Sequence, residues 1–130
     1  MKIIKQNQAT GYRRLAIYQK ADQLAHGVYK IAKKLPREEM FGLSSQLKRA
    51  VLSVPTNIVE GYARHSDQAF KNFLAISYSS LVEVEYLLYF TYQENLVSQD
   101  DFKGIQPQIE ELEKMLWQFI SKIKKDIAQR

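Results

Sequence analysis

The feature that most restricts the fold of this chain is an apolar pattern that recurs in four separate stretches. In each stretch apolar residues follow one another at spacings of three and four, which places them on one face of an α-helix. The first stretch begins near residue 14 and ends at Pro36, because proline disfavours the helical conformation of the residue before it. Its apolar residues are Ile17, Ala21, Leu24, Val28, Ile31 and Leu35.

The second stretch, residues 42–64, is apolar on more than one side and is predicted to be mostly buried. Its main seam consists of Leu43, Leu47, Ala50, Val51, Val54 and Ile58, and a further patch consists of Leu52, Pro55 and Val59. Ser44 or Ser45 is predicted to cap its start. Pro55 removes a backbone donor, so we expect a bend and a carbonyl near Val51 that needs a water or hydroxyl partner.

The third and fourth stretches complete the pattern. Ser66 is predicted to cap a helix that runs to about Asn95, and Ser98 to cap the last helix. Gly104 and Pro107 interrupt the fourth seam, so we expect a kink or a late start there. The third seam consists of Phe70, Phe73, Leu74, Ser77, Leu81, Val84 and Leu88, and the fourth of Phe102, Ile105, Ile109, Leu112, Leu116, Phe119, Ile123 and Ile127.

The third helix also carries small and aromatic residues that indicate how neighbouring helices pack against it. Its small residues, which would allow close approach of another helix, are Ser77, Ser79 and Ser80. Its tyrosines, which spread over several faces, are Tyr78, Tyr86, Tyr89 and Tyr92. Amphipathic rings on more than one side suit a helix that is contacted both within and across subunits.

Four amphipathic helices joined by short turns predict an all-α, antiparallel up-down-up-down four-helix bundle. The length of 130 residues suits one domain, which we assign to residues 13–130. Residues 1–12 are polar and lack periodicity, so we expect a flexible N-terminal arm.

Composition favours a soluble cytoplasmic protein. The sequence contains 0 cysteines, which excludes disulfides and thiolate metal sites. The apolar run at the N-terminus is too short for a signal peptide, and no window approaches the roughly 20 apolar residues of a membrane span. We therefore expect no membrane association.

The positive charge is concentrated in the first half of the chain. Residues 1–65 carry 12 Lys and Arg against 4 Asp and Glu, a net charge of +8, and residues 66–130 carry 7 against 10, a net charge of −3. The basic half either meets nucleic-acid phosphates or packs against the acidic half, within or between chains. On the first helix, the cations Lys30, Lys33, Lys34 and Arg37 form either a solvated face or one edge of an anion-binding patch.

A ladder of polar residues follows one side of the second helix. It consists of Gln46, Arg49, Ser53, Asn57, Glu60 and Arg64. In one interpretation, Arg49, Glu60 and Arg64 form a hydrogen-bonded network that holds subunits in register. In the other, the basic side chains meet RNA phosphates while Tyr62 or Tyr12 stacks on bases. The candidate nucleic-acid contacts are Arg13, Arg14, Lys30, Lys33, Lys34, Lys48, Arg49 and Arg64.

No constellation for catalysis or metal binding stands out. The consecutive residues His65, Ser66 and Asp67 cannot align as base, nucleophile and orienting acid. The two histidines, His26 and His65, have no partner at metal-ligand spacing. We therefore predict a non-enzymatic protein with no cofactor, no metal and no catalytic residue.

An ordered set of residues in the second helix resembles one known family. The matching residues are Gly42-Leu43, Gln46, Arg49, Ser53-Val54-Pro55, Asn57-Ile58, Glu60-Gly61 and Arg64. Further matches are Gln19-Lys20-Ala21, Leu35-Pro36 with Glu39, Phe70 with Phe73-Leu74, and Ser80-Leu81 with Glu83. Together they resemble the four-helix-bundle proteins encoded in intervening sequences of 23S ribosomal RNA genes.

The resemblance implies a ring-shaped homo-oligomer, a homopentamer, related to the accessory subunit of diversity-generating retroelements. That subunit is a pentameric barrel that binds a reverse transcriptase and nucleic acid. We therefore expect a homo-oligomeric bundle that binds nucleic acid, structured RNA in particular, through a basic surface. The alternative is a protein–protein adaptor or accessory subunit for a nucleic-acid enzyme such as a reverse transcriptase.

Overall fold

The computed structural model describes residues 9–130, which form four long α-helices and two short 3-10 helices, with no strand among these residues. The elements are η2 (Gly11–Arg14), α1 (Ala16–Lys33), η3 (Arg37–Glu39), α2 (Leu43–Ala63), α3 (Asp67–Gln93) and α4 (Gln99–Ala128). The predicted all-α fold with four helices is confirmed.

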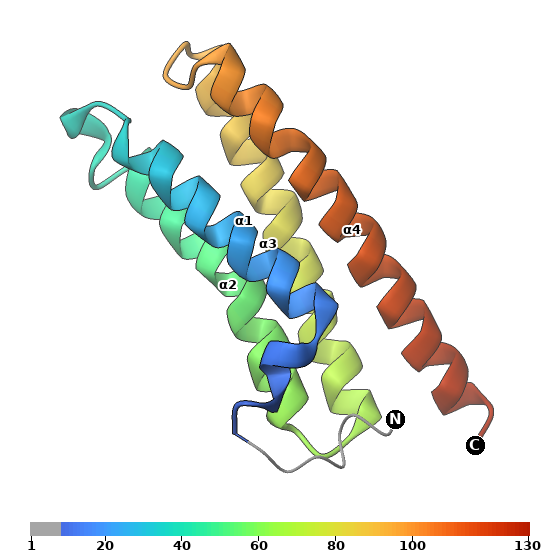
Figure 1. Ribbon diagram of the computed structural model, residues 1–130. Coiled ribbons are helices and arrows are strands. Elements are labelled where there is room, and N and C mark those ends of the chain that lie inside the picture. The colour runs from blue at the N-terminus through green and yellow to red at the C-terminus, as the bar shows by residue number, and fades with distance from the viewer. Residues whose placement is uncertain (1–8) are drawn as a thin grey trace.

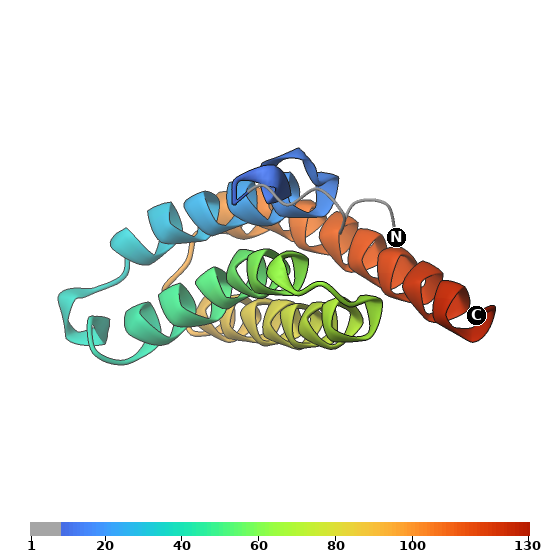
Figure 2. The same cartoon turned by 90° about the horizontal axis from the view of Figure 1, so that it is seen from below.

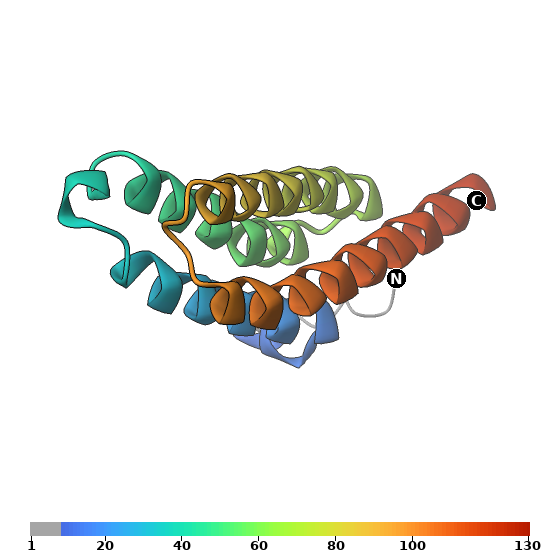
Figure 3. The same ribbon diagram turned by 90° about the horizontal axis from the view of Figure 1, so that it is seen from above.

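The helices are connected at alternating ends of the molecule (Figure 1). Each helix packs against the next one along the chain, and α1 also packs against α4. Seen along the layers, α2 and α3 lie side by side, with α1 and α4 on one side of that pair (Figures 2 and 3). α4 crosses the α2–α3 pair at an angle (Figures 2 and 3), and Arg130, just after its C-terminal end, forms an ion pair with Asp67 at the start of α3.

The four predicted seams meet to form the core. Their largest fully buried side chains include Leu24, Leu47, Ile58, Phe70, Leu74, Leu81, Leu88, Ile109, Leu112 and Leu116. The seam residues that are only half-buried are Leu43, Phe73, Phe102, Phe119 and Ile127. Three of these lie in the first or last turn of a helix, where neighbouring helices cover less of the surface.

The most extensive helix contact joins α2 and α3, and small side chains make it possible. The Ser77 hydroxyl donates to the Val54 carbonyl at 2.7 Å, and the Ser53 and Ser80 hydroxyls lie 2.8 Å apart. Bonds of this length between a side chain and the backbone of the facing helix require the two helices to approach closely. The predicted close approach at the third helix is confirmed at Ser77 and Ser80.

Pro55 lies inside α2, which continues through it to Ala63. Three successive carbonyls around the proline each accept a hydrogen bond from a side chain. Thr56 Oγ1 donates to the Leu52 carbonyl at 2.6 Å, Asn57 Nδ2 to Ser53 at 2.7 Å, and Ser77 Oγ to Val54 at 2.7 Å. The carbonyl that Pro55 leaves without its backbone donor is that of Val51, four residues earlier, and none of these three bonds goes to it.

Two of the predicted helix caps are confirmed and one is wrong. Ser66 Oγ accepts a hydrogen bond from the Ala69 N–H at 3.0 Å, and Ser98 Oγ accepts one from Asp101 at 3.1 Å. At the start of α2 neither Ser44 nor Ser45 is the cap, because the N-cap residue is Gly42 and its helix has no side-chain cap bond.

The predicted late start of the fourth helix is also wrong. α4 begins at Gln99 and runs through Gly104 and Pro107. Pro107 is exposed, so the carbonyl four residues earlier, which lacks its usual donor, can bond to water.

The N-terminal arm was predicted for residues 1–12. Residues 1–8 of this range lie outside the described residues. At its other end Gly11 and Tyr12 belong to η2 instead of a loose segment. Gly11 is buried against the Tyr62 side chain, whose hydroxyl would lie 2.3 Å from a Cβ added at that glycine.

One described helix, α3, is long and apolar enough to cross a membrane by length and composition alone, so the prediction that no window of the sequence approaches a membrane span is wrong. In this structure α3 packs against both α2 and α4. The central helix of a water-soluble bundle has the same length and apolar composition, so this property does not distinguish the two.

A glycine pair tests the α2–α3 contact. A Cβ at Gly61 would lie 2.8 Å from Phe73 Cβ and 2.9 Å from Phe70 Cδ1, whereas a Cβ at Gly104 meets no atom within 4 Å. Gly61→Ala is expected to lower the free energy of unfolding by about 1–2 kcal/mol, because overpacking exceeds the gain in helix propensity. Gly104→Ala is expected to raise it by about 0.5–1 kcal/mol. Urea titrations measure both; equal effects of the two substitutions would contradict the packing described.

Candidate nucleic-acid interface

The structure divides the predicted polar ladder of α2 into an inner and an outer part. The inner residues, Ser53 and Asn57, are half-buried and bond within the chain. Asn57 Nδ2 donates to the Ser53 hydroxyl at 2.9 Å, and that hydroxyl also contacts Ser80 on α3 at 2.8 Å. The exposed outer residues are Gln46, Arg49, Glu60 and Arg64.

A shallow polar groove of about 320 Å³ lies where the ladder meets α3. Its lining residues are Gln46, Arg49, Ala50, Ser53, Ser80 and Glu83. Arg49 and Glu83 bring opposite charges to this groove, one from each helix. Within the described part of the chain, no ion pair joins Arg49, Glu60 and Arg64 to one another. The predicted network of these three residues is therefore not formed within one subunit.

Arg64 is held at the far end of the ladder. Its guanidinium carbon lies 5.0 Å from the centroid of the Phe73 ring, the distance of a cation–π contact. Arg49 and Arg64 are 15 positions apart in one helix, which separates them by about 22 Å. They cannot contact the same phosphate.

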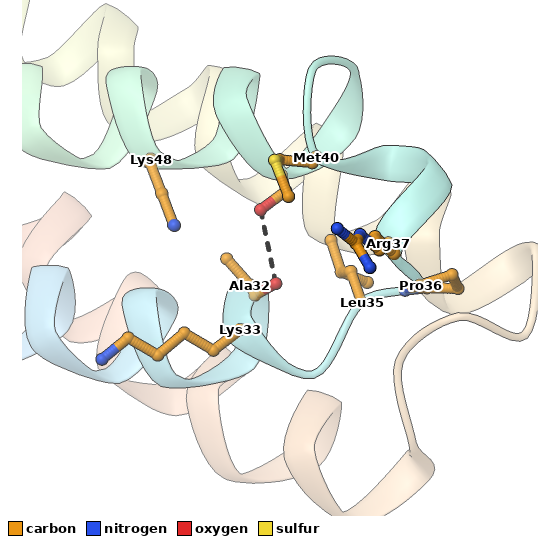
Figure 4. A pocket seen from close by; sticks show the side chains of 8 residues that line it. Ala32, Lys33, Leu35, Pro36, Arg37, Met40 and Lys48 are labelled. Atoms are coloured by element: carbon orange, nitrogen blue, oxygen red, sulfur yellow. Dashed lines mark hydrogen bonds between the residues drawn. The ribbon is translucent and has the colours of Figure 1, made fainter.

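A second hollow lies at the corner where α1 leads through η3 into α2 (Figure 4). Its volume is about 410 Å³, and its lining residues are Ala32, Lys33, Leu35, Pro36, Arg37, Met40, Ser44 and Lys48. The Ser44 hydroxyl donates to the Ala32 carbonyl at 3.4 Å and links α2 to the last full turn of α1. We call this hollow the corner pocket.

The lining of the corner pocket carries three cations and no carboxylate. Lys33 and Arg37 are exposed, and Lys48 is half-buried with its Nζ 5.4 Å from the centroid of the Tyr29 ring. Figure 4 shows Lys48 extending from α2 toward α1, Arg37 beside Leu35, and Lys33 extending along α1 away from Arg37. None of the three forms an ion pair with a described acidic residue. The pocket is therefore electropositive.

The other predicted nucleic-acid contacts lie in different places. Lys30 is exposed one turn before Lys33 on α1. Lys34 is paired with Asp101 of α4 at 3.0 Å, so much of its charge is already compensated. Arg13 and Arg14 belong to η2, at the opposite end of α1 from the corner pocket.

Arg13 lies close to an aromatic ring. Its guanidinium carbon is 5.8 Å from the Tyr12 centroid, and a hydrogen bond with Tyr12 raises the pKa of Arg13. The structure thus brings together Lys30, Lys33 and Lys48 but separates them from Arg13 and Arg14 and from the two arginines of the ladder.

The comparisons with known proteins can be set against this geometry. A family model described as 23S rRNA-intervening sequence protein matches residues 13–118. The chain belongs to this family. As a 23S rRNA-intervening sequence protein it is also similar to a solved structure from Bacteroides thetaiotaomicron, described as a protein with unknown function from the S23 ribosomal protein family. The two share 25% sequence identity with a TM-score of 0.75, and the alignment covers 81% of this chain and 95% of the other. A search of curated proteins finds no significant match.

The aromatic residues predicted to stack on bases are not available for it. Tyr62 is buried, with 6% of its surface exposed, so its proposed stacking role is wrong. Tyr12 is half-buried and packs edge-on against Tyr18, with ring centroids 4.8 Å apart. Both tyrosines face the interior because η2 folds back against α2, which no local pattern reveals.

The aromatic residue that sequence reasoning missed is Phe41. It is 92% exposed and lies next to Met40, a lining residue of the corner pocket. The signal was present: Met40 and Phe41 form an apolar pair inside a short connection, outside every helical seam. Such residues have no role in core packing, which leaves them free to contact a partner.

Ser53 and Ser80 allow a direct test of the inner ladder. In a double-mutant cycle of Ser53→Ala and Ser80→Ala, we expect a coupling energy of about 0.5–1 kcal/mol, because the bond is half-buried. The exposed bond between Gln68 and Asn72 at 3.2 Å is the matched control, with an expected coupling near zero. Thermal and urea unfolding measure both cycles, and equal couplings would show that the serine pair is not specially protected from water.

Proposed function

We propose that this 23S rRNA-intervening sequence protein is a non-enzymatic RNA-binding homo-oligomer of the cytoplasm. Each subunit is an antiparallel up-down-up-down bundle, and several form a ring. The observation that carries RNA binding is the corner pocket, whose lining holds Lys33, Arg37 and Lys48 and no carboxylate. Three cations that line one hollow, none of them ion-paired with a described acidic residue, suit a phosphate group, which carries its charge on several oxygens.

The charge distribution supports the same conclusion at larger scale. Residues 1–65 carry a net charge of +8, and α1, η3 and α2 hold six of the 12 cations in this range. Binding to phosphates releases the counterions condensed on the nucleic acid, which provides affinity without sequence recognition. RNA is favoured over DNA because the family takes its description from 23S rRNA.

Self-association is supported by apolar side chains on the outer face of α3. The large exposed residues there are Ile76, Val82, Tyr86 and Phe90, and Leu52 is exposed on neighbouring α2. Tyr86 alone is 58% exposed. An apolar strip beside the charged outer residues Arg49 and Glu60 has the mixed character of a subunit interface. In a ring, these charges would find partners in the next subunit.

The second candidate function is a protein–protein adaptor for a nucleic-acid enzyme such as a reverse transcriptase. The observation that favours it is the same apolar strip, since a partner of a different kind could cover it. Co-purification from the native host distinguishes the two: an adaptor would retain a stoichiometric partner protein after nuclease treatment, whereas an RNA-binding oligomer would not.

Electrostatic RNA binding makes a quantitative prediction. In filter binding across a salt series, affinity for RNA is expected to fall steeply with salt. Lys33→Gln and Lys48→Gln are each expected to reduce the slope of log affinity against log salt by about 0.7–0.9, the contribution of one phosphate contact. Lys124→Gln, at an exposed position of α4, is the matched control and should leave the slope unchanged. Salt-independent binding, or none at low salt, would refute the proposal.

The ring makes a separate prediction. Light scattering of the wild-type protein is expected to give a multiple of the 15.2 kDa chain mass. Arg49→Glu and Tyr86→Glu should each shift the measured mass toward that of one chain. Arg49→Glu reverses a charge that would pair with an acidic residue of the next subunit, and Tyr86→Glu places a charge inside an apolar contact. Lys124→Glu on α4 is the control. A wild-type monomer, or an unchanged mass in both variants, would argue against this face as the interface.

A further inference from the structure

Phe41 is the most exposed large apolar side chain of the described residues, at 92%. It lies in the connection between η3 and α2, with Met40, itself 48% exposed, as the preceding residue. No ring contact or cation–π contact involves it among the described residues. Placing a whole phenyl ring in water costs free energy unless a partner covers it.

We propose that the corner between α1 and α2 binds one unpaired nucleotide of RNA. Its phosphate occupies the corner pocket and its base stacks on the Phe41 ring. This inference rests on the proposed RNA binding and adds to it a location, a preference for unpaired RNA, and a residue that reads the base. The argument combines three neighbouring features of the same connection.

The first feature is the cationic lining. Lys33 of α1, Lys48 of α2 and Arg37 of η3 all belong to the lining, so three elements each contribute one cation to it. The carboxylates nearest in sequence, Glu38 and Glu39, are not among the lining residues. A volume of about 410 Å³ is ample for a phosphate group with part of its ribose.

The second feature is the distance along the chain from phosphate site to aromatic ring. Met40 lines the pocket and Phe41 directly follows it, so the Cα atom of Phe41 lies about 3.8 Å from that of a lining residue. The phosphate and the base of one nucleotide are separated by only one sugar. A phosphate bound in the pocket therefore places its base within reach of Phe41.

The third feature is the openness of the ring. In a duplex each base is already stacked on both sides, whereas an unpaired base offers a free face. Stacking of bases on aromatic side chains is the common way in which proteins hold single-stranded RNA. Because the Phe41 ring is not packed against the protein, it can accept such a base without rearrangement of the core.

A lipid surface is the other partner that combines cations with an exposed ring. Interfacial membrane binding usually depends on a helix with a broad apolar face. Here the exposed apolar residues of the corner are two, Met40 and Phe41, in a turn, while the cations line a hollow. The geometry therefore favours a single anionic group with an attached ring.

A fluorescence experiment tests the inference directly. The chain contains 1 tryptophan, Trp117 on α4, so the double variant Phe41→Trp, Trp117→Phe moves the only indole to the corner. A single-stranded RNA of about ten nucleotides is expected to quench this indole strongly, because stacked bases quench tryptophan. The wild-type protein, whose indole is 62% exposed but far from the pocket in sequence, is the matched control and should show little quenching.

A pair of binding variants gives the second measurement. Phe41→Leu keeps an apolar side chain but removes the ring, and it should weaken binding of the single-stranded RNA about tenfold. It should leave binding of a blunt RNA duplex of the same length within about twofold. Trp117→Leu, which removes an exposed aromatic side chain elsewhere, should change neither. Circular dichroism confirms that each variant remains folded.

The outcomes separate this inference from the proposed function. RNA binding without quenching at the corner, or equal quenching by the blunt duplex, overturns the inference and leaves RNA binding in place. A change in indole emission with phosphatidylserine vesicles but not with RNA overturns it in favour of a lipid surface. Absence of RNA binding by filter assay at low salt overturns both.

Discussion

The close contact between α2 and α3 is the constraint on which the rest of the molecule depends. Pro55 removes a backbone donor from the middle of α2, and the side chains of Thr56, Asn57 and Ser77 bond to the carbonyls around it. Ser77 reaches across from α3, so its bond to the Val54 carbonyl joins the two helices. A larger residue at this position would both lose the bond and force the helices apart.

This contact determines which surfaces are left for partners. Because the inner ladder residues Ser53 and Asn57 bond within the chain, only the outer ones remain at the surface. The tight α2–α3 pair also turns the other side of α3 outward, with Tyr86 and its apolar neighbours. At the end of the pair, the connection from α1 places Lys33, Arg37 and Lys48 around one hollow. The same packing thus positions both the strip proposed for self-association and the pocket proposed for RNA.

Much of the fold could be predicted because its signals are local. The seams, and the caps Ser66 and Ser98, depend on spacing and on residue type within one turn of helix. The predicted serine cap of α2 is wrong for a non-local reason, because Ser44 donates to the Ala32 carbonyl of α1 instead of capping its own helix. The prediction that Tyr62 stacks on a base is wrong for the same kind of reason, because Gly11 and its neighbours, from another part of the chain, cover the ring.

The sequence by itself determined four amphipathic helices, their seams, the excess of positive charge before residue 66, and the family. These properties follow from periodicity, composition and order along the chain, which need no knowledge of neighbours in space. Only the tertiary structure decided which cations meet. Lys33 and Lys48 are 15 positions apart yet line one pocket, whereas Lys34, next to Lys33, pairs with Asp101 of α4. Helix packing brings distant residues together and turns adjacent ones about 100° apart, so the composition of a site depends on the fold.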